Sequence, residues 1–294
     1  MAARVVVIGD ALIDELVDDE GTAHHVGGSA LNVAVGLSIL GVPASLVAMV
    51  GDDVDGALIR GHLADFGVEL LPTITPHGTG IARSERVDGE PRYSFSESMV
   101  GRTIDFDAAQ RTAIADADIV AVSGFPFDVP AQVELLESAV AGRPHVAVDP
   151  NPRPGMLHDA EAFRRALEGF GGIAQLIKLG DDDAQLLWGE PVADVAPRLL
   201  ARYPYVLATE GKAGASIRIG DARWRHPSLV TPDAVVDTMG AGDSVFAAVL
   251  SEIATVGIRD MDWFDTLERA MRIAAATVAE PGALLRVPAA HRGG

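Results

Sequence analysis

The sequence predicts an α/β fold in which a central, mostly parallel sheet carries helices on both faces, within a single domain over residues 1–294. Short runs rich in Val and Ile alternate with longer segments of helical periodicity, as in consecutive β–α–β units. A chain of 294 residues suits one large α/β domain, and its 48% hydrophobic content is enough for a sizeable core. The 22% of charged residues is typical of a globular protein.

Six short apolar runs are predicted to be buried strands because β-branched residues are frequent in them. They are residues 4–9, 44–50, 119–123, 145–148, 176–179 and 205–209. Helical periodicity predicts seven helices between and after these runs, and Gly and Asp signals mark the starts of the last two. The helices are residues 29–40, 56–66, 131–141, 160–167, 182–188, 241–254 and 263–279.

One region interrupts the alternation. Residues 68–98 place alternating polar and apolar residues around the turn signal Asp88-Gly89, which predicts a β-hairpin. Together with residues 12–26, this hairpin is expected to form a small second sheet. An exposed hairpin buries little surface by itself, so we expect it to cover something. A lid over a pocket and a contact in a homodimer are both open, and the two can coincide.

The composition excludes several classes of function. The formal charge is −19, from 23 basic and 42 acidic residues, so we expect no binding to nucleic acid or to an anionic membrane. An anionic small substrate is not excluded. The chain has no cysteine, which rules out disulfides, thiolate zinc sites and cysteine nucleophiles. The first apolar run is broken by Gly9 and Asp10 and is too short for a signal peptide, so we expect a cytoplasmic protein.

Two common nucleotide-binding motifs are absent. The chain has two lysines, and Gly211-Lys212 is followed by Ala213, so there is no Walker A loop. The first predicted strand runs into "GDALID" and lacks the glycines of a dinucleotide fingerprint. A nucleotide would therefore have to bind elsewhere in the chain.

The stretch "DTMGAGDSVFAAVL", residues 237–250, is the strongest candidate for a site. Gly240, Ala241 and Gly242 open a helix with little side-chain bulk, which leaves backbone N–H groups free to bind an anion. Asp243 lies in the first helical turn, where its carboxylate can accept a proton beside that anion. Phosphoryl transfer to a hydroxyl requires this pair of groups. A glycine turn with Asp243 as an ordinary helix cap is the alternative.

A second stretch, "GGSALNVAVGLSILG", covers residues 27–41. It begins with a glycine pair that includes Gly28, and it places Asn32 near the first turn of a helix. An asparagine amide both donates and accepts hydrogen bonds, which suits the hydroxyl groups of a sugar. A glycine turn followed by a core helix explains the same residues without a ligand.

Together these two stretches resemble the paired signatures of the ribokinase-type (PfkB) carbohydrate kinase family. The resemblance extends over nearly the whole chain, in the family's order and spacing. "VVVIGDALIDELV" is similar to the family's first strand, and "MVGDDVDG" is similar to its Val-Gly-x-Asp-x-x-Gly segment. "DPNPRPGM" is similar to a segment of fructokinases and 2-keto-3-deoxygluconate kinases. The resemblance implies a ribokinase-like fold with a small β-sheet lid, and an enzyme that uses ATP and Mg²⁺.

The resemblance also implies roles for individual residues. Asp243 matches the general base, and Gly240, Ala241 and Gly242 match the anion hole for the transferred phosphate. Asp14, Gly28 and Asn32 match sugar contacts, and from the lid Arg83 or Phe95 is expected to reach the sugar. Thr209 and Gly211 match nucleotide contacts, as does Gly214 in "ATEGKAGA". Lys178 lies at a strand end near the nucleotide, although a solvated lysine explains it equally well.

Two departures from the family pattern affect the ions. The family usually has Asn-x-x-Glu where this chain has Gly180 and Asp183, so Asp183 is expected to hold Mg²⁺ through water only if a shorter side chain suffices. Asp181 and Asp182 are alternatives, and three acids at a helix start also favour its dipole. Arg286 stands where the family's monovalent-cation loop often has Ser, which leaves the need for K⁺ open.

The identity of the sugar follows less directly. Arg153 can pair with a substrate carboxylate or with a nucleotide phosphate, or it can belong to a braced surface loop. "GDALIDELV" followed by "DPNPRP" is most similar to fructokinases, so fructose or a similar ketose is the first choice. A keto-deoxy sugar acid, ribose or a nucleoside is the alternative acceptor. A non-catalytic sugar- or nucleotide-binding regulator on the same fold is the alternative of another class.

Overall fold

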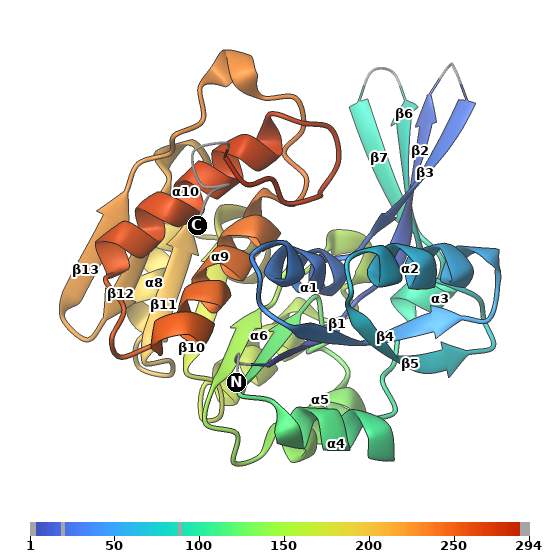
Figure 1. Cartoon of the computed structure of the whole chain (residues 1–294), viewed down its shortest axis with the longest axis horizontal. Coiled ribbons are helices and arrows are strands. Elements are labelled where there is room, and N and C mark those ends of the chain that lie inside the picture. The colour runs from blue at the N-terminus through green and yellow to red at the C-terminus, as the bar shows by residue number, and fades with distance from the viewer. Residues whose placement is uncertain (1–3, 19–20, 88–89, 289–294) are drawn as a thin grey trace.

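The computed structural model describes residues 4–18, 21–87 and 90–288, which form a large and a small sheet (Figure 1). The large sheet contains β1 (Val5–Gly9), β4 (Ala44–Gly51), β5 (Glu69–Thr75), β8 (Ile119–Ser123), β9 (Val146–Asp149), β10 (Leu176–Gly180), β11 (Tyr205–Thr209), β12 (Ala215–Ile219) and β13 (Ala222–His226). The small sheet contains β2 (Leu12–Asp18), β3 (Gly21–Gly27), β6 (Ile81–Val87) and β7 (Glu90–Phe95).

The strand order of the large sheet is β13-β12-β11-β10-β9-β8-β1-β4-β5. All pairs from β11 to β5 are parallel, and β12 and β13 extend the sheet as antiparallel strands. The central strand β1 shows why this sheet needs two helical layers. Val5 and Val7 pack into the core on one face, whereas Val6 and Ile8 pack into the core on the other.

Helices cover both faces of the large sheet, as the alternation of strands and helices predicted (Figure 1). One layer contains α1 (Ser29–Ile39), α2 (Val54–Asp65), α9 (Ala241–Val256) and α10 (Trp263–Val278). The other contains α4 (Ala108–Asp116), α5 (Pro130–Val140), α6 (Ala160–Phe170), α7 (Asp181–Trp188) and α8 (Val192–Leu199). The short elements are α3 (Glu97–Val100) and the 3₁₀ turns η1 (Pro154–Met156), η2 (Gly211–Ala213) and η3 (Pro232–Ala234).

The small sheet stands away from the large one in the order β3-β2-β6-β7 (Figure 1). Its strands β6 and β7 pair antiparallel, as expected for a hairpin, and the predicted turn Asp88-Gly89 lies outside the described residues. The expected span of 68–98 was too long, because β5 belongs to the large sheet and pairs with β4. As an edge strand, β5 is only partly buried and includes Pro72. Its mixture of polar and apolar residues therefore resembled that of the exposed hairpin.

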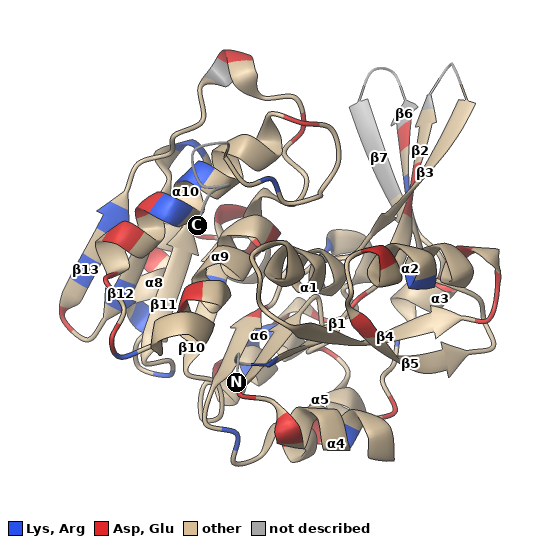
Figure 2. Ribbon diagram, in the orientation of Figure 1, with Lys and Arg blue, Asp and Glu red and all other residues tan. Residues whose placement is uncertain are grey.

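The edge formed by β12 and β13 carries arginines although the chain as a whole is strongly acidic (Figure 2). Arg223 and Arg225 lie on β13, and each pairs with Glu210, at 3.3 and 3.2 Å. Like charges on an outermost strand discourage pairing with the edge of another sheet. Within the described residues, no helix is long and apolar enough to cross a membrane.

Asp53 joins the large sheet to the segment that leads into the small one. Its carboxylate caps α2 by accepting from Gly56 N at 2.7 Å, and it accepts from Thr79 N at 2.7 Å and from Thr79 Oγ1 at 2.6 Å. The Thr79 hydroxyl also accepts from Gly51 N, at the end of β4, at 3.0 Å. The acid and glycines of "MVGDDVDG" therefore fix the segment between β5 and β6 against the end of β4.

We predict that Asp53→Ala lowers the free energy of unfolding by about 2 kcal/mol, because the helix cap and the bonds to Thr79 are lost together. Urea denaturation followed by circular dichroism measures this change. Asp52→Ala is the matched control, since Asp52 is exposed and forms no hydrogen bond with a described residue. Equal unfolding midpoints for the two variants would contradict the role given to Asp53.

Candidate active site

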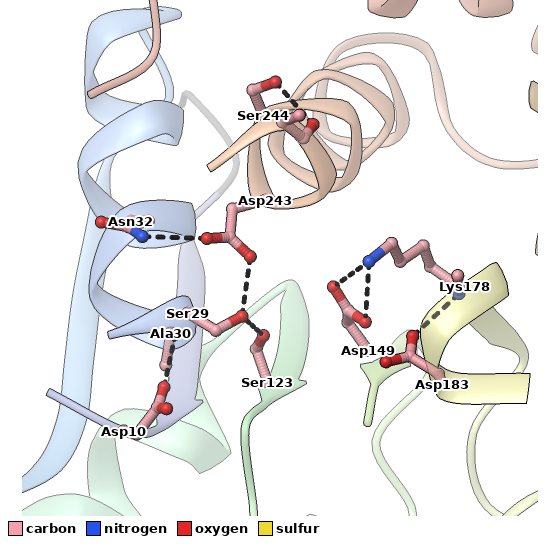
Figure 3. A network of polar contacts seen from close by, with 12 residues as sticks. Asp10, Ser29, Ala30, Asn32, Ser123, Asp149, Lys178, Asp183, Asp243 and Ser244 are labelled. Atoms are coloured by element: carbon pink, nitrogen blue, oxygen red, sulfur yellow. Dashed lines mark hydrogen bonds and ion pairs between the residues drawn. The ribbon is translucent and has the colours of Figure 1, made fainter. Parts of the chain in front are cut away.

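Polar residues gather where the parallel strands of the large sheet end. Asp10 directly follows β1, Ser123 ends β8, Asp149 ends β9, and Lys178 lies in β10 two residues before its end. Helices α1 and α9 begin above this edge, so their first turns face these side chains (Figure 3). In open α/β sheets, ligands bind outside the carboxyl ends of the strands. The structure thus brings the two sequence signatures together at the expected edge.

Asp243 is held by hydrogen bonds from α1. Ser29 Oγ donates to Asp243 Oδ1 at 2.7 Å, and Asn32 Nδ2 donates to Asp243 Oδ2 at 2.9 Å (Figure 3). The Ser29 hydroxyl also contacts Ser123 Oγ at 2.5 Å. These bonds fix the carboxylate and still leave lone pairs on both oxygens for a further donor. Asn32, which the sequence suggested as a sugar contact, here binds the predicted base itself.

The sequence analysis missed Ser29 and Ser123 as members of this network. Both are buried, at 5% and 0% exposure. Ser29 lies inside the quoted "GGSAL" stretch, and Ser123 is a hydroxyl at the end of a parallel strand. That position in the strand was the only signal for Ser123, because the two serines are 94 residues apart in the chain.

The turn before α9 requires its glycines. Gly240 has φ 72°, and a Cβ there would lie 2.4 Å from the Ala283 carbonyl oxygen. A Cβ on Gly242 would lie 2.8 Å from Lys178 Nζ. Among the described residues, the N–H groups of Gly240, Gly242 and Asp243 have no acceptor, whereas Ala241 N reaches Thr238 O at 3.4 Å. The free amides are therefore those of residues 240, 242 and 243, not the predicted run of 240–242.

The glycine pair at the start of α1 makes room for a carboxylate. A Cβ on Gly27 would lie 2.1 Å from Asp14 Oδ2, and a Cβ on Gly28 would lie 2.8 Å from the Asp10 carbonyl oxygen. Gly28 also has φ 110°, which other residues rarely adopt. The first amides of α1 are not open to an anion, because Ala30 N donates to Asp10 Oδ1 at 3.0 Å and Leu31 N donates to Asp10 O at 3.2 Å.

Asp14 and Asp10 are carboxylates in unfavourable surroundings. Burial, followed by the nearby charge of Asp10, raises the pKa of Asp14 to about 6, and Arg153 opposes the rise. Burial likewise raises the pKa of Asp10 to about 6, against the Ala30 amide and the buried Arg102. The Asp14 carboxylate accepts no hydrogen bond from a described residue. It is thus a partly desolvated acceptor without a donor, which suits the hydroxyl group of a ligand.

The two candidate lid residues lie on opposite faces of the small sheet. Asp14 and Phe95 both pair with Ala82, so they share one face, and Phe95 packs there on Leu12 and Met156. Arg83 is on the other face, where it pairs with Glu15 at 3.1 Å and with Glu85. Phe95 therefore lies on the same face as Asp14, whereas Arg83 lies on the other face, so its role as a sugar contact is not favoured.

The "DPNPRPGM" segment supplies one buried and one exposed charge. Asp149 is 0% exposed, and its two carboxylate oxygens accept from Lys178 Nζ at 3.1 and 2.9 Å (Figure 3). Burial lowers the pKa of Lys178, but the charges of Asp149 and Asp183 together with the hydrogen bond to Asp149 more than offset this, so its pKa is raised and the amine is protonated. Asn151 has the uncommon φ of 41°, and Arg153 is exposed.

The predicted nucleotide contacts form a tight turn at the same edge. Thr209 ends β11 beside Gly180, and the 3₁₀ turn η2 follows. Gly211 has φ 49° and Gly214 has φ 97°. A Cβ on Gly214 would lie 2.2 Å from the His226 carbonyl oxygen, so this glycine is needed for packing whether or not a nucleotide binds.

Asp183, the predicted metal residue, has a structural contact of its own. Its Oδ2 accepts from Gly180 N at 2.8 Å, which caps α7. Burial raises its pKa, and the Lys178 charge opposes this. The described part of the chain contains no cluster of three His, Asp or Glu side chains arranged to hold a metal ion. One oxygen of Asp183 remains free, which fits at most a contact to a metal through water.

Comparison with known proteins identifies the family. The family model of pfkB family carbohydrate kinases matches residues 2–290. A fructokinase of Rhizobium leguminosarum bv. trifolii is 30% identical over 263 residues, which is 85% of this chain and 79% of that protein. A 2-dehydro-3-deoxygluconokinase of Bacillus subtilis is 26% identical over 309 residues, which is 98% of this chain and 93% of that protein.

A solved structure agrees with the fold. Fructokinase of Xylella fastidiosa, crystallised with bound ATP, superposes with a TM-score of 0.77 at 23% identity over 96% of this chain and 94% of that one. The match to the family model agrees with the order of the sequence motifs and with the two-sheet fold. The chain therefore belongs to the pfkB family of carbohydrate kinases and is an ATP-dependent sugar kinase.

Proposed function

We propose that this kinase transfers the γ-phosphoryl group of ATP to a hydroxyl of fructose or a similar ketose, with Asp243 as the general base. The observation that carries the proposal is the placement of Asp243, which two donors from α1 orient beside the free amides of Gly242 and of Asp243 itself. An oriented proton acceptor next to an anion site is the arrangement that phosphoryl transfer requires.

In the proposed reaction, Asp243 accepts the proton of the sugar hydroxyl as its oxygen bonds to the γ-phosphorus. The bond from that phosphorus to the bridging oxygen breaks, and ADP leaves. The N–H groups of Gly240, Gly242 and Asp243 donate to the phosphoryl oxygens, where negative charge is held during the transfer. Ser29 and Asn32 keep the carboxylate aimed at the acceptor.

The sugar is proposed to lie between the strand ends of the large sheet and the inner face of the small sheet. Asp14 accepts from its hydroxyl groups, Gly28 lines its floor, and the free groups of the Asn32 amide contact it. Phe95 covers it from β7, and closure of the small sheet as a lid would exclude water, which competes as an acceptor. We leave Arg83 out of the site because it pairs with Glu15 on the outer face.

The nucleotide is proposed to lie beside α9, with Thr209, Gly211, Gly214 and Lys178 on its side of the site. Mg²⁺ would accompany ATP and neutralise charge on the phosphates, with Asp183 holding it through water. The need for K⁺ stays a prediction. Arg286, which stands at the family's cation loop, donates from its backbone N–H to Thr277 Oγ1 at 3.1 Å. A homodimer through the small sheet also stays a prediction.

A keto-deoxy sugar acid is the second candidate acceptor. Arg153 favours it, since this exposed guanidinium lies near enough to Asp10 and Asp14 to act on their pKa values and can pair with a substrate carboxylate. The fructokinase relatives favour the neutral ketose. Coupled ADP release over ketoses, aldoses, sugar acids and nucleosides measures the preference directly.

We predict that Asp243→Asn lowers kcat by about 10²–10⁴-fold with the best acceptor of that panel, because the general base is lost. The sugar KM is expected to change little. Asp265→Asn is the matched control, an exposed acid in the first turn of α10, and it should keep the activity of the unaltered enzyme. Turnover by Asp243→Asn within threefold of that activity would remove Asp243 from the role.

A second prediction concerns Asp14. Its pKa of about 6 exceeds the ordinary 3.8, so the folded state loses stability relative to the unfolded chain as the pH rises from below 4 to above 6. Asp14→Asn should therefore raise the free energy of unfolding at pH 8 by about 1–2 kcal/mol, after allowance for partial exposure. This gain should disappear near pH ~3.

The same variant should weaken sugar binding, with a KM about 10-fold higher or more, because a charged acceptor is lost. Denaturation at several pH values and steady-state kinetics measure the two effects. Glu15→Gln is the control for KM, since Glu15 neighbours Asp14 on the outer face of β2. An Asp14→Asn enzyme that is less stable at pH 8 and has an unchanged KM would refute the assignment.

A further inference from the structure

Arg102 is a buried cation at the base of the small sheet. It lies in the segment between α3 and α4, where the chain returns to the large sheet, and it is 9% exposed. Its Nε donates to Gly124 O and its Nη1 donates to Met99 O, both at 3.3 Å. Within the described part of the chain, it forms no ion pair with a carboxylate. A buried charge without a direct partner is unfavourable, so stability alone explains this arginine poorly.

Two carboxylates lie near enough to act on Arg102. Burial lowers the pKa of Arg102, and the charges of Asp10 and Asp128 oppose this. Asp128 Oδ2 accepts from His158 N at 2.6 Å, whereas its Oδ1 is buried without a hydrogen-bond partner among the described residues. Asp10 and Arg102 line the same cavity of about 10 Å³, which is room for about one water molecule. Because a guanidinium stays protonated, Arg102 brings a permanent positive charge to this cavity.

The Asp10 carboxylate helps to fix the start of α1. Its Oδ1 accepts from Ala30 N at 3.0 Å, as Figure 3 shows, and its backbone oxygen accepts from Leu31 N at 3.2 Å. The N-cap of α1 is Gly28, which has no side chain that could do this. Asp10 therefore supplies acceptors from outside the helix, and a negative charge is favourable at a helix N-terminus.

The same first turn of α1 orients the proposed base. Ser29 Oγ and Asn32 Nδ2 donate to the two carboxylate oxygens of Asp243, at 2.7 and 2.9 Å. A shift of the start of α1 would move both donors. The Asp10 carboxylate thus lies one helix turn away from the contacts that orient Asp243.

Gly124 connects this capping carboxylate to the arginine. Its carbonyl oxygen accepts from Arg102 Nε, and a Cβ on it would lie 2.6 Å from the Asp10 carboxylate oxygens. It has φ 64°, which favours glycine. Arg102, Gly124 and Asp10 therefore form one continuous set of contacts that ends at α1.

We propose that Arg102 is a positioning residue for phosphoryl transfer: its positive charge keeps Asp10 a charged acceptor at the start of α1, which holds Asp243 in place. The proposal rests on the proposed function, in which Asp243 is the general base. Neither Arg102 nor Asp10 contacts the reacting atoms in this role. Asp10 immediately precedes the small sheet in the chain and Arg102 follows it, so the same contacts tie both ends of that sheet to α1.

The other charged groups around Asp10 determine what its loss of charge would look like. Burial raises the pKa of Asp10 to about 6, against the amide from α1 and Arg102. Asp243 adds to the rise, and the exposed Arg153 opposes it. Without Arg102 the pKa of Asp10 should rise further, so that it is partly protonated at neutral pH. The pKa of Asp14 would move the opposite way, because the Asp10 charge helps to raise it.

The first experiment replaces the cation by an apolar side chain. In Arg102→Met, the ratio of kcat at pH ~6.5 to kcat at pH ~8.5 should fall about threefold or more below that of the unaltered enzyme. Arg102→Lys keeps a charge and should restore most of this ratio. Arg259→Met is the matched control, an exposed arginine with no hydrogen bond to a described residue, and it should leave the ratio unchanged. An unchanged ratio in Arg102→Met would overturn the proposal.

The second experiment removes the charge from the other partner. Asp10→Asn keeps the volume and an acceptor oxygen but cannot titrate, so kcat should fall about 5–10-fold at both pH values. The values of kcat and kcat/KM should fall together, with the sugar KM within about threefold of the original. In this background Arg102→Met should cost less than about twofold more and should leave the pH ratio unchanged. A pH dependence that persists there would come from another group, such as Asp128, and would refute the role given to Asp10.

A third measurement follows the Asp10 carboxyl group without any assay of activity. Carboxyl-carbon NMR of the aspartates, with the signal missing in Asp10→Asn as the assignment, should show Asp10 titrating near pH 6 in the unaltered protein. In Arg102→Met the same signal should titrate at higher pH. A purely structural arginine would leave this titration where it is, and that result would contradict the proposal.

The outcome stays decisive if Arg102→Met does not fold. In that case Asp10→Asn decides, and full turnover with Asn at position 10 at both pH values would overturn the proposal. The outcome for Asp243→Asn separates the two levels of the argument. If that variant is fully active, the proposed function itself is wrong. If it is inactive while Arg102→Met keeps the original pH ratio, only the role of Arg102 is wrong.

Discussion

Two helices, α1 and α9, begin at the same end of the large sheet, and hydrogen bonds from Ser29 and Asn32 to Asp243 join their first turns. This junction determines where the Asp243 carboxylate and the free amides of α9 lie relative to each other. It requires that the chain pass closely at Gly28 and Gly240, where a Cβ would strike backbone atoms of other segments. It also leaves the first amides of α9 open, while those of α1 are taken by Asp10. The start of α9 thus has N–H groups without an acceptor, and α1 holds the Asp243 carboxylate beside them.

The surroundings of this junction contain more negative than positive charge. Asp10, Asp14 and Asp243 lie together, and burial raises the pKa of the first two. Such carboxylates work against folding at neutral pH and are favourable only when hydroxyl donors or cations reach them. Among the cationic groups, Arg102 and Arg153 act to lower the pKa of Asp10, and Lys178, held by Asp149, borders the first turn of α9.

The predictable part of the fold followed from periodicity and β-branched runs. The strands of the large sheet that are buried on both faces were visible in the sequence as apolar runs. The edge strand β5 was not, because it is only partly buried. The short antiparallel strands β12 and β13 were not predicted. In β13, Arg223 and Arg225 replace the apolar residues that mark a strand, and in β12 the polar Ser216 and Arg218 interrupt them. Helices α4 and α8 were missed as well, and α8 contains Pro197, which usually argues against a helix.

In the candidate site, short sequence motifs predicted the residues that form turns. Contacts between residues far apart in the chain could not be predicted from such motifs. Asp243, Gly240 and Gly242 lie in one short stretch at the start of a helix, so their positions in that turn could be predicted from the sequence. The link from Ser29 to Ser123, and the approach of Lys178 to Gly242, join distant segments and depend on the fold. The face of the small sheet on which Arg83 lies depends on strand register, which the motif did not determine. Periodicity therefore predicts elements well and pairings of side chains poorly.

The most direct test of the account is a crystal structure of the enzyme with a non-hydrolysable ATP analogue and its preferred sugar. The account predicts an Asp243 carboxylate oxygen within about 3 Å of the acceptor hydroxyl. It also predicts that the terminal phosphate is bound by the amides of Gly242 and Asp243. A structure in which Asp243 keeps only its bonds to Ser29 and Asn32, with the sugar hydroxyl or the terminal phosphate bound elsewhere, would contradict it.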